Sequence, residues 1–220
     1  MYPVYEPHED SYLLLKQVPK YAKGDVLDMG TGSGIIAVEA ANYAKTVLAV
    51  DLNPLAVKYV HERTRHLSNL TVKQSNLFTY VTGRFDAIFF NAPYLPNDHR
   101  SKDIALDGGL NGYEVIDEFL IYAREHLKPE GVIVLLFSNH SKPEHIHQTI
   151  DTNGYKYKPV SRLKLDFEEL YVYEIRINAD GISRKGKARS RTSRNVERST
   201  SSGKNTKPKK RRTKPHPKRS

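Results

Sequence analysis

The segment Leu27–Gly34 reads Leu-Asp-Met-Gly-Thr-Gly-Ser-Gly and joins a short apolar run to a predicted helix. Gly30, Gly32 and Gly34 let the backbone turn tightly and approach a ligand closely. Their G-x-G-x-G spacing differs from the G-x-G-x-x-G pattern of dinucleotide-binding turns. Asp28 lies two residues before the first glycine, where its charge would repel a pyrophosphate at the helix N-terminus. The segment therefore predicts a site for a ligand that carries positive charge.

S-Adenosyl-L-methionine meets this requirement, because it carries a sulfonium and an amino group and no phosphate. Asp51 ends the next predicted strand, where an acid can accept both ribose hydroxyls. An exposed acid in a turn is the alternative interpretation. Asn76 follows the third predicted strand and can hydrogen-bond the adenine amine, although a turn asparagine would look the same. We therefore predict S-adenosyl-L-methionine as the cofactor in preference to a dinucleotide.

The tetrapeptide Asn91-Ala-Pro-Tyr94 directly follows the near-continuous apolar run 85–91. A nitrogen conjugated to a ring or a carbonyl is a poor nucleophile, because its lone pair is delocalised. If the Asn91 side-chain oxygen and the Ala92 carbonyl accept its two hydrogens, charge builds up on nitrogen and the lone pair is aimed at a methyl group. Pro93 favours extended backbone at Ala92, and Tyr94 offers a ring face to a planar group. An ordinary Asn-Ala-Pro turn is the alternative interpretation.

Strand-like apolar runs alternate with helical patterns through residues 1–177, which indicates a three-layer α/β domain with a mostly parallel sheet. Ligands in such sheets bind at the carboxyl ends of the strands, where the three motifs are expected to meet. The last two strands are expected to form an antiparallel pair at the end of the sheet. We expect helices at 10–18, 34–43, 54–66, 114–127 and 143–152, and strands at 25–29, 46–51, 70–75, 85–91, 132–138, 157–165 and 169–177.

Three local expectations follow from the same patterns. The helix at 34–43 is apolar nearly all round, so we expect it to be buried against the sheet. The segment Lys128-Pro-Glu-Gly131 is expected to stop the helix that precedes it. Asp10 or Ser11 is positioned to cap the first helix.

The tetrapeptide resembles the Asn/Asp-Pro-Pro-Tyr signature of methyltransferases that act on planar amino groups, namely adenine-N6 DNA enzymes and HemK-like glutamine methyltransferases of translation release factors. Ala92 departs from this signature at the first proline, although only its carbonyl is needed. The segment Tyr5–Leu14 is similar to the Y-E-P-x-E-D-[ST] segment of the archaeal and eukaryotic HemK-like enzymes. The segments 106–112 and 135–139 resemble that family's glycine-rich segment beside the substrate and its next strand. The resemblance covers about residues 2–177.

This resemblance implies a Rossmann-like class I fold that uses S-adenosyl-L-methionine, with Asn91 on the substrate amide. Position 76 is usually Asp in the family, so Asn76 loses a charge there. The expected substrate is the glutamine of the Gly-Gly-Gln loop of a class I release factor. A small zinc-binding activator subunit, paired along the edge of the third strand, is an expected partner. Cofactor contacts are expected at Ser11, Asp28, Gly30, Gly32, Asp51, Asn76, Leu77 and Asn91.

Charge divides the chain into two expected parts. Residues 181–220 hold 16 Lys and Arg and one acid, whereas residues 1–180 hold 19 basic and 24 acidic residues. Residues 1–180 are therefore expected to form the catalytic domain. The chain is expected to start directly with this domain, as HemK-like enzymes of the archaeal and eukaryotic type do. The tail has too few apolar residues to offset its ordering entropy, so we expect it to be disordered. It is either a tether to nucleic acid or ribosomes or a silent solubilising extension.

Several classes of function are excluded or disfavoured. The chain has no cysteine, which rules out disulfides, thiolate catalysis and Cys-ligated zinc within it. Its longest apolar run, 132–137, is far shorter than a membrane span, and no signal peptide is recognisable, so we expect a cytoplasmic protein. The histidine pairs 145/147 and 61/66 are poorly aligned on their helices. We therefore predict no metal site and interpret all four as surface residues.

Two other functions remain open at this point. An adenine-N6 methyltransferase of DNA or RNA fits the tetrapeptide, and the basic tail would favour it. The net acidic first 180 residues, and the lack of a recognition domain that flips and reads a base, count against it. A non-catalytic methyltransferase-fold protein that binds RNA or ribosomes is the second alternative, favoured by the departures at Ala92 and Asn76. Our prediction is methyl transfer to a protein glutamine.

Overall fold

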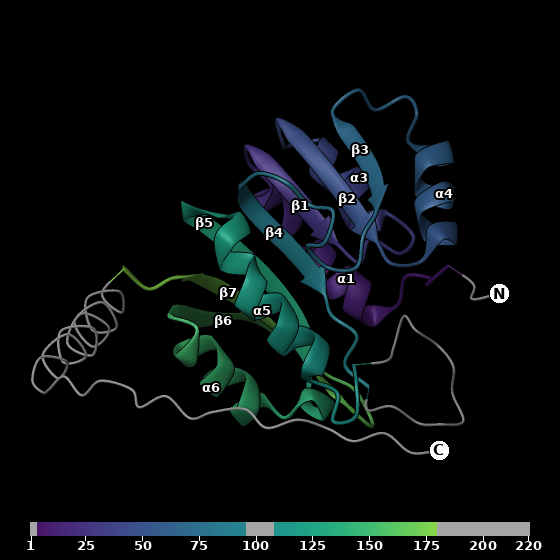
Figure 1. The fold of residues 1–220 in the computed structure, drawn as a ribbon. Coiled ribbons are helices and arrows are strands. Elements are labelled where there is room, and N and C mark those ends of the chain that lie inside the picture. The colour runs from purple at the N-terminus through teal and green to yellow at the C-terminus, as the bar shows by residue number, and fades with distance from the viewer. Residues whose placement is uncertain (1–3, 96–107, 180–220) are drawn as a thin grey trace, which may run out of the picture. The chain divides into compact units, whose positions relative to one another are not determined.

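The computed structural model describes residues 4–95 and 108–179, and the expected tail at 181–220 lies outside them. A seven-stranded sheet in the order β3-β2-β1-β4-β5-β7-β6 forms the middle layer (Figure 1). Its strands are β1 (Asp25–Met29), β2 (Thr46–Asp51), β3 (Leu70–Gln74), β4 (Phe85–Asn91), β5 (Leu127–Ser138), β6 (Tyr155–Lys164) and β7 (Glu169–Ile177). The helices are α1 (Glu9–Leu15), α2 (Val18–Tyr21), α3 (Ile35–Ala41), α4 (Pro54–Arg63), α5 (Glu114–His126) and α6 (Pro143–Thr152), with a 3-10 turn at Asn139–Ser141.

The chain reverses its direction of travel across the sheet between β1 and β4. The strands β1, β2 and β3 step outward to one edge, and β4 returns to the other side of β1. All pairings from β3 to β5 are parallel, while β7 lies antiparallel to both β5 and β6. The expected mostly parallel sheet with an antiparallel end is confirmed. A reversal of this kind leaves a crevice at the carboxyl ends of the two strands concerned.

Helices cover both faces of the sheet and enclose two clusters of buried side chains. On one face, α5 and α6 contribute Phe119, Leu120 and Ile146, which pack against the apolar residues of β4 and β5. On the other face, α1, α2 and α3 bury Leu14 and Ala37 against the opposite sides of the same strands. The central strands are therefore buried on both faces, which explains why their sequences are continuously apolar rather than alternating.

Three expectations about helices need correction. The helix expected at 10–18 is two short helices, because Pro19 inside one continuous helix would clash with the preceding turn and lacks a hydrogen-bonding N–H. In the structure Pro19 lies in the first turn of α2, where proline is tolerated. The helix α3, expected to be buried against the sheet rather than to lie on it, leaves Val38 42 % exposed. The helix α4 ends at Arg63, and the Thr64 hydroxyl donates to the carbonyl of Val60 at 2.8 Å.

The helix α5 ends at His126, just before the segment 128–131 that was expected to stop it, and this segment belongs to strand β5, which begins at Leu127. The register between β4 and β5 shifts there, so the segment is an irregular strand start rather than a turn. Gly131 is needed at this place because a Cβ would lie 2.9 Å from the Phe85 carbonyl oxygen. The close approach of two backbones, and not a turn, accounts for this glycine.

We predict that Phe119→Ala lowers the free energy of unfolding by about 3–5 kcal/mol, because a large cavity would form in the core. Phe119 is fully buried and its ring lies 4.6 Å from that of Phe90 and 5.4 Å from that of Phe78. The matched control is Tyr122→Ala on the same helix, where the side chain is 50 % exposed. Urea unfolding of both variants should separate them clearly, and equal losses would contradict this account of the core.

Candidate active site

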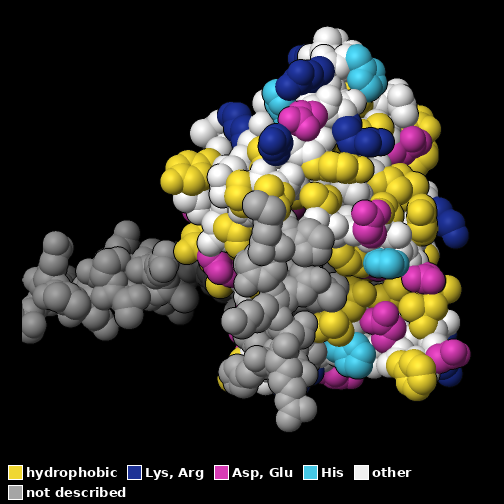
Figure 2. All heavy atoms as spheres, turned by 90° about the vertical axis from the view of Figure 1, so that its right-hand side faces the viewer, with side chains coloured by type: hydrophobic (Ala, Val, Ile, Leu, Met, Phe, Trp, Pro, Cys, Tyr) yellow, Lys and Arg dark blue, Asp and Glu magenta, His cyan; other side chains and the backbone are white. Residues whose placement is uncertain are grey.

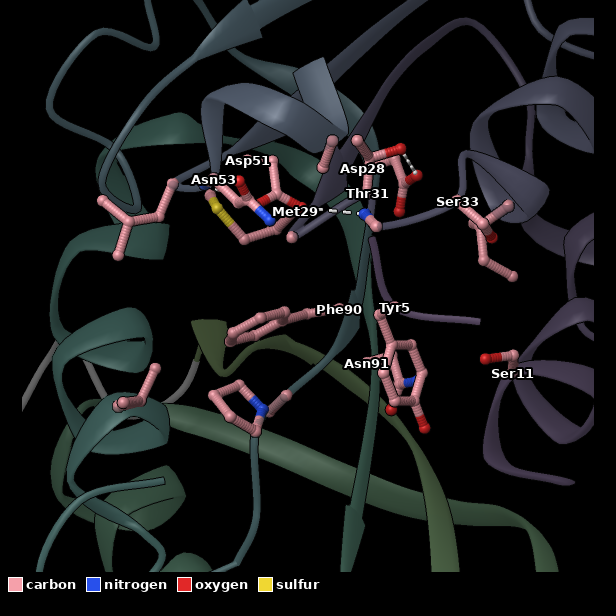
Figure 3. Close-up of a pocket in the computed structure, with 18 of the residues that line it drawn as sticks. Tyr5, Ser11, Asp28, Met29, Thr31, Ser33, Asp51, Asn53, Phe90 and Asn91 are labelled. Carbon is pink, nitrogen blue, oxygen red and sulfur yellow. Dashed lines mark hydrogen bonds between the residues drawn. The ribbon is translucent and has the colours of Figure 1, made fainter. Parts of the chain in front are cut away.

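A cavity of about 290 Å³ opens at the carboxyl ends of β1, β2 and β4, where the chain reverses across the sheet. Figure 3 shows side chains from these strand ends, from the N-terminal segment and from α1 pointing into one space. All the residues predicted from sequence line this cavity: Ser11, Asp28, Gly30, Gly32, Asp51, Asn76, Leu77, Asn91, Ala92, Pro93 and Tyr94. The structure thus brings together motifs that lie far apart along the chain.

The glycine turn after β1 needs backbone angles that favour glycine. Gly30, Gly32 and Gly34 have φ values of 65°, 52° and 83°, in the left-handed region. The backbone N–H of Thr31 donates to Val50 of β2 at 2.9 Å and anchors the turn to the neighbouring strand. Gly32 lies against Tyr5, because a Cβ at this position would be 3.5 Å from the Tyr5 Cβ. The N-terminal segment therefore covers the turn.

Asp28, near the carboxyl end of β1, is a buried acid with one side-chain partner. It is 2 % exposed, and the Thr31 hydroxyl donates to its Oδ2 at 2.6 Å (Figure 3). Burial raises the pKa of Asp28 to about 7, with a smaller contribution from the charge of Asp51. An acid in this state favours a cationic ligand, because a positive charge beside it would stabilise the ionised form.

Asp51, at the end of β2, holds the glycine turn with its carboxylate. Its Oδ2 accepts from the Gly32 N–H and its Oδ1 accepts from the Asn53 N–H, both at 2.8 Å. Burial raises its pKa, while these backbone hydrogen bonds lower it. Each carboxylate oxygen can accept a second hydrogen bond, so the group remains able to bind hydroxyls in the cavity.

The turn after β3 places Asn76 and Leu77 at the rim of the cavity. Asn76 is exposed, and Leu77 has a φ of 43°, which is uncommon for a residue with a side chain. The Ser75 hydroxyl donates to the Leu77 carbonyl at 2.7 Å and accepts from the Tyr80 N–H at 3.0 Å. These bonds hold the strained turn, so that the backbone of Leu77 stays beside the cavity.

Asn91 ends β4 and has an unusual hydrogen-bonding state. Its Nδ2 donates to Asp10 Oδ2 at 3.0 Å. Its Oδ1 is buried and has no hydrogen-bond partner among the residues that the structure describes. A buried acceptor without a partner is costly unless a ligand supplies the donor. The next residue, Ala92, is fixed by its N–H, which donates to Leu136 of β5 at 3.2 Å.

The expectation that Asp10 or Ser11 caps the first helix is wrong. The N-terminal cap position of α1 is His8, and no side chain caps the helix. Asp10 instead points into the protein, is 3 % exposed, and accepts hydrogen bonds from Tyr5, Ser11 and Asn91. Sequence reasoning missed this role because it assigned the segment to a local cap. The apolar residues that follow, on one face of α1, are the signal that this end of the helix turns inward.

Two aromatic rings line the same cavity, and sequence reasoning singled out only one of them. The Phe90 ring points into it from β4, as Figure 3 shows. The Tyr94 side chain is almost buried, and its pKa is raised mainly by burial and then by the charge of Asp10. Both rings form an apolar wall beside Asn91. Sequence reasoning gave a role to Tyr94 but not to Phe90, which is one apolar residue within an apolar strand.

The histidines were expected to be surface residues, and two of them lie partly buried against neighbouring side chains. His145 is half-buried and its Nε2 lies 2.7 Å from Asp117 Oδ2, while His147 lies 2.9 Å from the Tyr173 hydroxyl. Neither faces the other. Within residues 4–95 and 108–179, no group of three or more His, Cys, Asp or Glu is arranged to hold a metal ion. No helix in those ranges is long and apolar enough to cross a membrane.

The high pKa of Asp28 predicts a pH-dependent loss of stability in the cofactor-free protein. The ordinary value is 3.8 and the folded value about 7, so the folded protein keeps a proton that the unfolded chain releases. Stability therefore falls as the pH rises between these two values, by an amount on the order of a few kcal/mol. We expect Asp28→Asn to be more stable relative to wild type at pH 8 than at pH 5 in urea unfolding.

Asp25→Asn is the matched control for this experiment. Asp25 is a surface acid whose pKa is lowered by its hydrogen bond with Lys128. It is ionised in both states between pH 5 and pH 8, so its substitution should shift stability equally at the two pH values. If Asp28→Asn behaved in the same way, Asp28 would not carry the perturbed pKa.

Comparisons with known proteins agree with this geometry. Residues 5–157 match the methyltransferase small domain family. A protein of Methanocaldococcus jannaschii assigned as a protein N5-glutamine methyltransferase is 40 % identical over 177 residues, covering 77 % of this chain and 89 % of that protein. Methyltransferase HEMK2 of Mus musculus is 32 % identical over 169 residues, covering 69 % of this chain and 79 % of that protein.

A solved structure shows the same arrangement. The E. cuniculi Mtq2–Trm112 complex, responsible for methylation of the translation termination factor eRF1, contains a chain that superimposes with a TM-score of 0.64 at 25 % identity. The match covers 79 % of the present chain and 98 % of that one. The present chain therefore belongs to the HemK-like protein glutamine N5-methyltransferases, within a small-domain methyltransferase family that depends on S-adenosyl-L-methionine.

Proposed function

We propose that this protein transfers a methyl group from S-adenosyl-L-methionine to the side-chain amide nitrogen of the Gly-Gly-Gln glutamine in a class I peptide chain release factor. The observation that carries the proposal is the Asn91 Oδ1 atom, a buried acceptor without a described partner at the end of β4. It lies in the same cavity as the two acids Asp28 and Asp51. The functions named for the relatives support the choice of a protein glutamine.

The residues of the cavity fit the cofactor in chemistry and in place. Asp51 has free acceptor capacity for the two ribose hydroxyls, and the glycine turn lets the backbone approach the ligand. Asp28 suits the cationic methionine part, because its burial leaves it without a cationic partner in the described residues. We assign the adenine to the side of Asn76 and the Leu77 backbone, and a further contact to Ser11 on α1.

The tetrapeptide would activate the acceptor nitrogen. Asn91 Oδ1 and the Ala92 carbonyl accept the two amide hydrogens, which raises electron density on a nitrogen that conjugation makes poorly nucleophilic. Pro93 and the nearly buried Tyr94 shape an apolar wall against which the planar amide lies. The cofactor supplies a methyl carbon on a positively charged sulfur. When bound, the cofactor would give up this methyl group to the acceptor nitrogen with loss of its C–S bond, and one proton would leave that nitrogen for solvent.

The test is a methyl-transfer assay with labelled cofactor and three acceptors: a release factor with Gly-Gly-Gln, the same factor with that glutamine changed, and a mixed DNA and RNA pool. We expect label on the intact factor alone. Asn91→Ala should lower kcat by about 100-fold or more, the loss typical of removing one such hydrogen-bond group. The affinity of this variant for the cofactor, measured by calorimetry, should fall much less than kcat does.

Each of the other results has a defined meaning. Label on nucleic acid would move the protein to the adenine-N6 class. No cofactor binding, even with an activator subunit present, would favour a non-catalytic binding protein. Label on the factor whose glutamine is changed would show that another residue is the acceptor, and the role proposed for Asn91 would then need a different planar group.

We also propose that a small zinc-binding activator subunit pairs with the free edge of β3. In the described part of the chain β3 pairs only with β2, so its other edge is open. Figure 2 shows the side of the molecule that carries β3 and α4, where hydrophobic side chains lie beside Lys and Arg. Leu52 and Tyr59, next to this edge, are 47 % and 38 % exposed. Open edges of this kind accept a strand from another chain.

Val72→Pro should weaken this association at least tenfold, because proline removes a donor from the edge. The Ser75 N–H donates to the Asp51 carbonyl of β2. The N–H and C=O groups of successive residues in a strand point to alternate edges, so those of Val72 point away from β2. The ladder to β2 is then preserved. Val72→Thr, which keeps the N–H, is the control. Calorimetric titration with the activator measures both, and unchanged affinity in Val72→Pro would place the partner elsewhere.

The division into a domain at 1–180 and a basic tail at 181–220 stays a prediction, as does contact of that tail with nucleic acid or ribosomes. The proposed substrate acts in translation, so we assign the protein to the cytoplasm on that basis. Tail contact predicts salt-sensitive association with RNA. This contact of the tail with RNA is independent of the proposed methyl transfer.

A further inference from the structure

The carboxylate of Asp10 is surrounded by hydrogen-bond donors. Its Oδ2 accepts from the Tyr5 hydroxyl at 2.7 Å and from Asn91 Nδ2 at 3.0 Å. Its Oδ1 accepts from the N–H and the hydroxyl of Ser11. A carboxylate has about four acceptor sites, and four donors occupy them here. Asp10 is 3 % exposed, so water contributes little to this arrangement.

This carboxylate decides which way the Asn91 amide points. The two ends of an asparagine amide have nearly the same shape, so only hydrogen bonding distinguishes them. An ionised carboxylate can only accept, and it would repel Oδ1 if the amide turned over. Asn91 Nδ2 must therefore face Asp10, and Oδ1 must face away from it. The Oδ1 atom is the one that is buried without a partner among the described residues.

We propose that Asp10 is a positioning residue for methyl transfer, which orients the Asn91 amide so that its oxygen accepts a hydrogen of the acceptor nitrogen. This inference rests on the proposed function and deepens it. Asp10 itself contacts no reacting atom. Its removal leaves the Asn91 amide free to present its NH₂ group to the acceptor, where two donors would face each other and the lone pair would not be activated.

A charge swap between the two positions tests this role. Asp10→Asn alone should lower kcat about 100-fold, the loss that misplacement of a catalytic group commonly produces, with KM for the cofactor and the acceptor changed little. Asn91→Asp alone should lower kcat to a similar extent, because two carboxylates would then face each other where one hydrogen-bond donor is needed. The double variant Asp10→Asn/Asn91→Asp restores one donor and one acceptor with their places exchanged.

The surroundings permit this exchange. The hydroxyl of Tyr5 can accept as well as donate, so it can turn to receive a hydrogen from an amide at position 10. The donors of Ser11 still find an oxygen there. We expect the double variant to recover kcat to within about tenfold of wild type, whereas independent effects would multiply to a loss of about 10,000-fold.

The matched control is Glu9→Gln, which neutralises the exposed neighbouring acid and should leave kcat unchanged. All variants are assayed with the activator subunit and a Gly-Gly-Gln release factor, and their melting temperatures and cofactor affinities are measured alongside. Normal kcat in folded Asp10→Asn, or a double variant as poor as the product of its singles, would overturn the inference. Absence of transfer by the wild-type protein would instead contradict the proposed function.

Discussion

The hydrogen bond from the Asn91 amide nitrogen to the Asp10 carboxylate joins the end of the central strand β4 to the first helix. The Asp10 carboxylate is buried and the Asn91 side chain is half-buried, so water competes only weakly for this hydrogen bond. Through it, an acid near the N-terminus determines which atom of Asn91 faces the cavity. The same carboxylate holds Tyr5, which lies over the glycine turn. One group therefore connects the covering segment, the turn and the catalytic strand.

The rest of the fold keeps the partners of this bond in place. The reversal of strand order between β1 and β4 creates the crevice, and helices on both faces bury the strands that line it. Asp28 lies within that burial, and its raised pKa shows that the cavity destabilises an isolated negative charge. A cationic ligand relieves this penalty. The site is thus arranged to be more stable with such a ligand than without it.

The sequence was sufficient to predict the sheet and the site residues at strand ends. Asp28, Asp51 and Asn91 each follow a clear apolar run, and parallel strands bring their carboxyl ends to one edge. Contacts between distant segments were not predictable in this way. Asp10 and Asn91 are 81 residues apart, and a polar residue beside a helix start looks like a cap. In the sequence, Gly131 cannot be told from a glycine that stops a helix. Its actual constraint is the nearby Phe85 carbonyl, which belongs to another strand and is not visible from the local sequence.

A structure of the protein with S-adenosylhomocysteine and a Gly-Gly-Gln peptide tests the central claim most directly. We expect the glutamine side-chain nitrogen to lie within hydrogen-bond distance, about 3 Å, of both Asn91 Oδ1 and the Ala92 carbonyl. Asn91 Nδ2 should remain on the Asp10 carboxylate. A glutamine bound with its nitrogen away from Asn91, or an Asn91 amide that has left Asp10, would contradict both the proposed chemistry and its positioning.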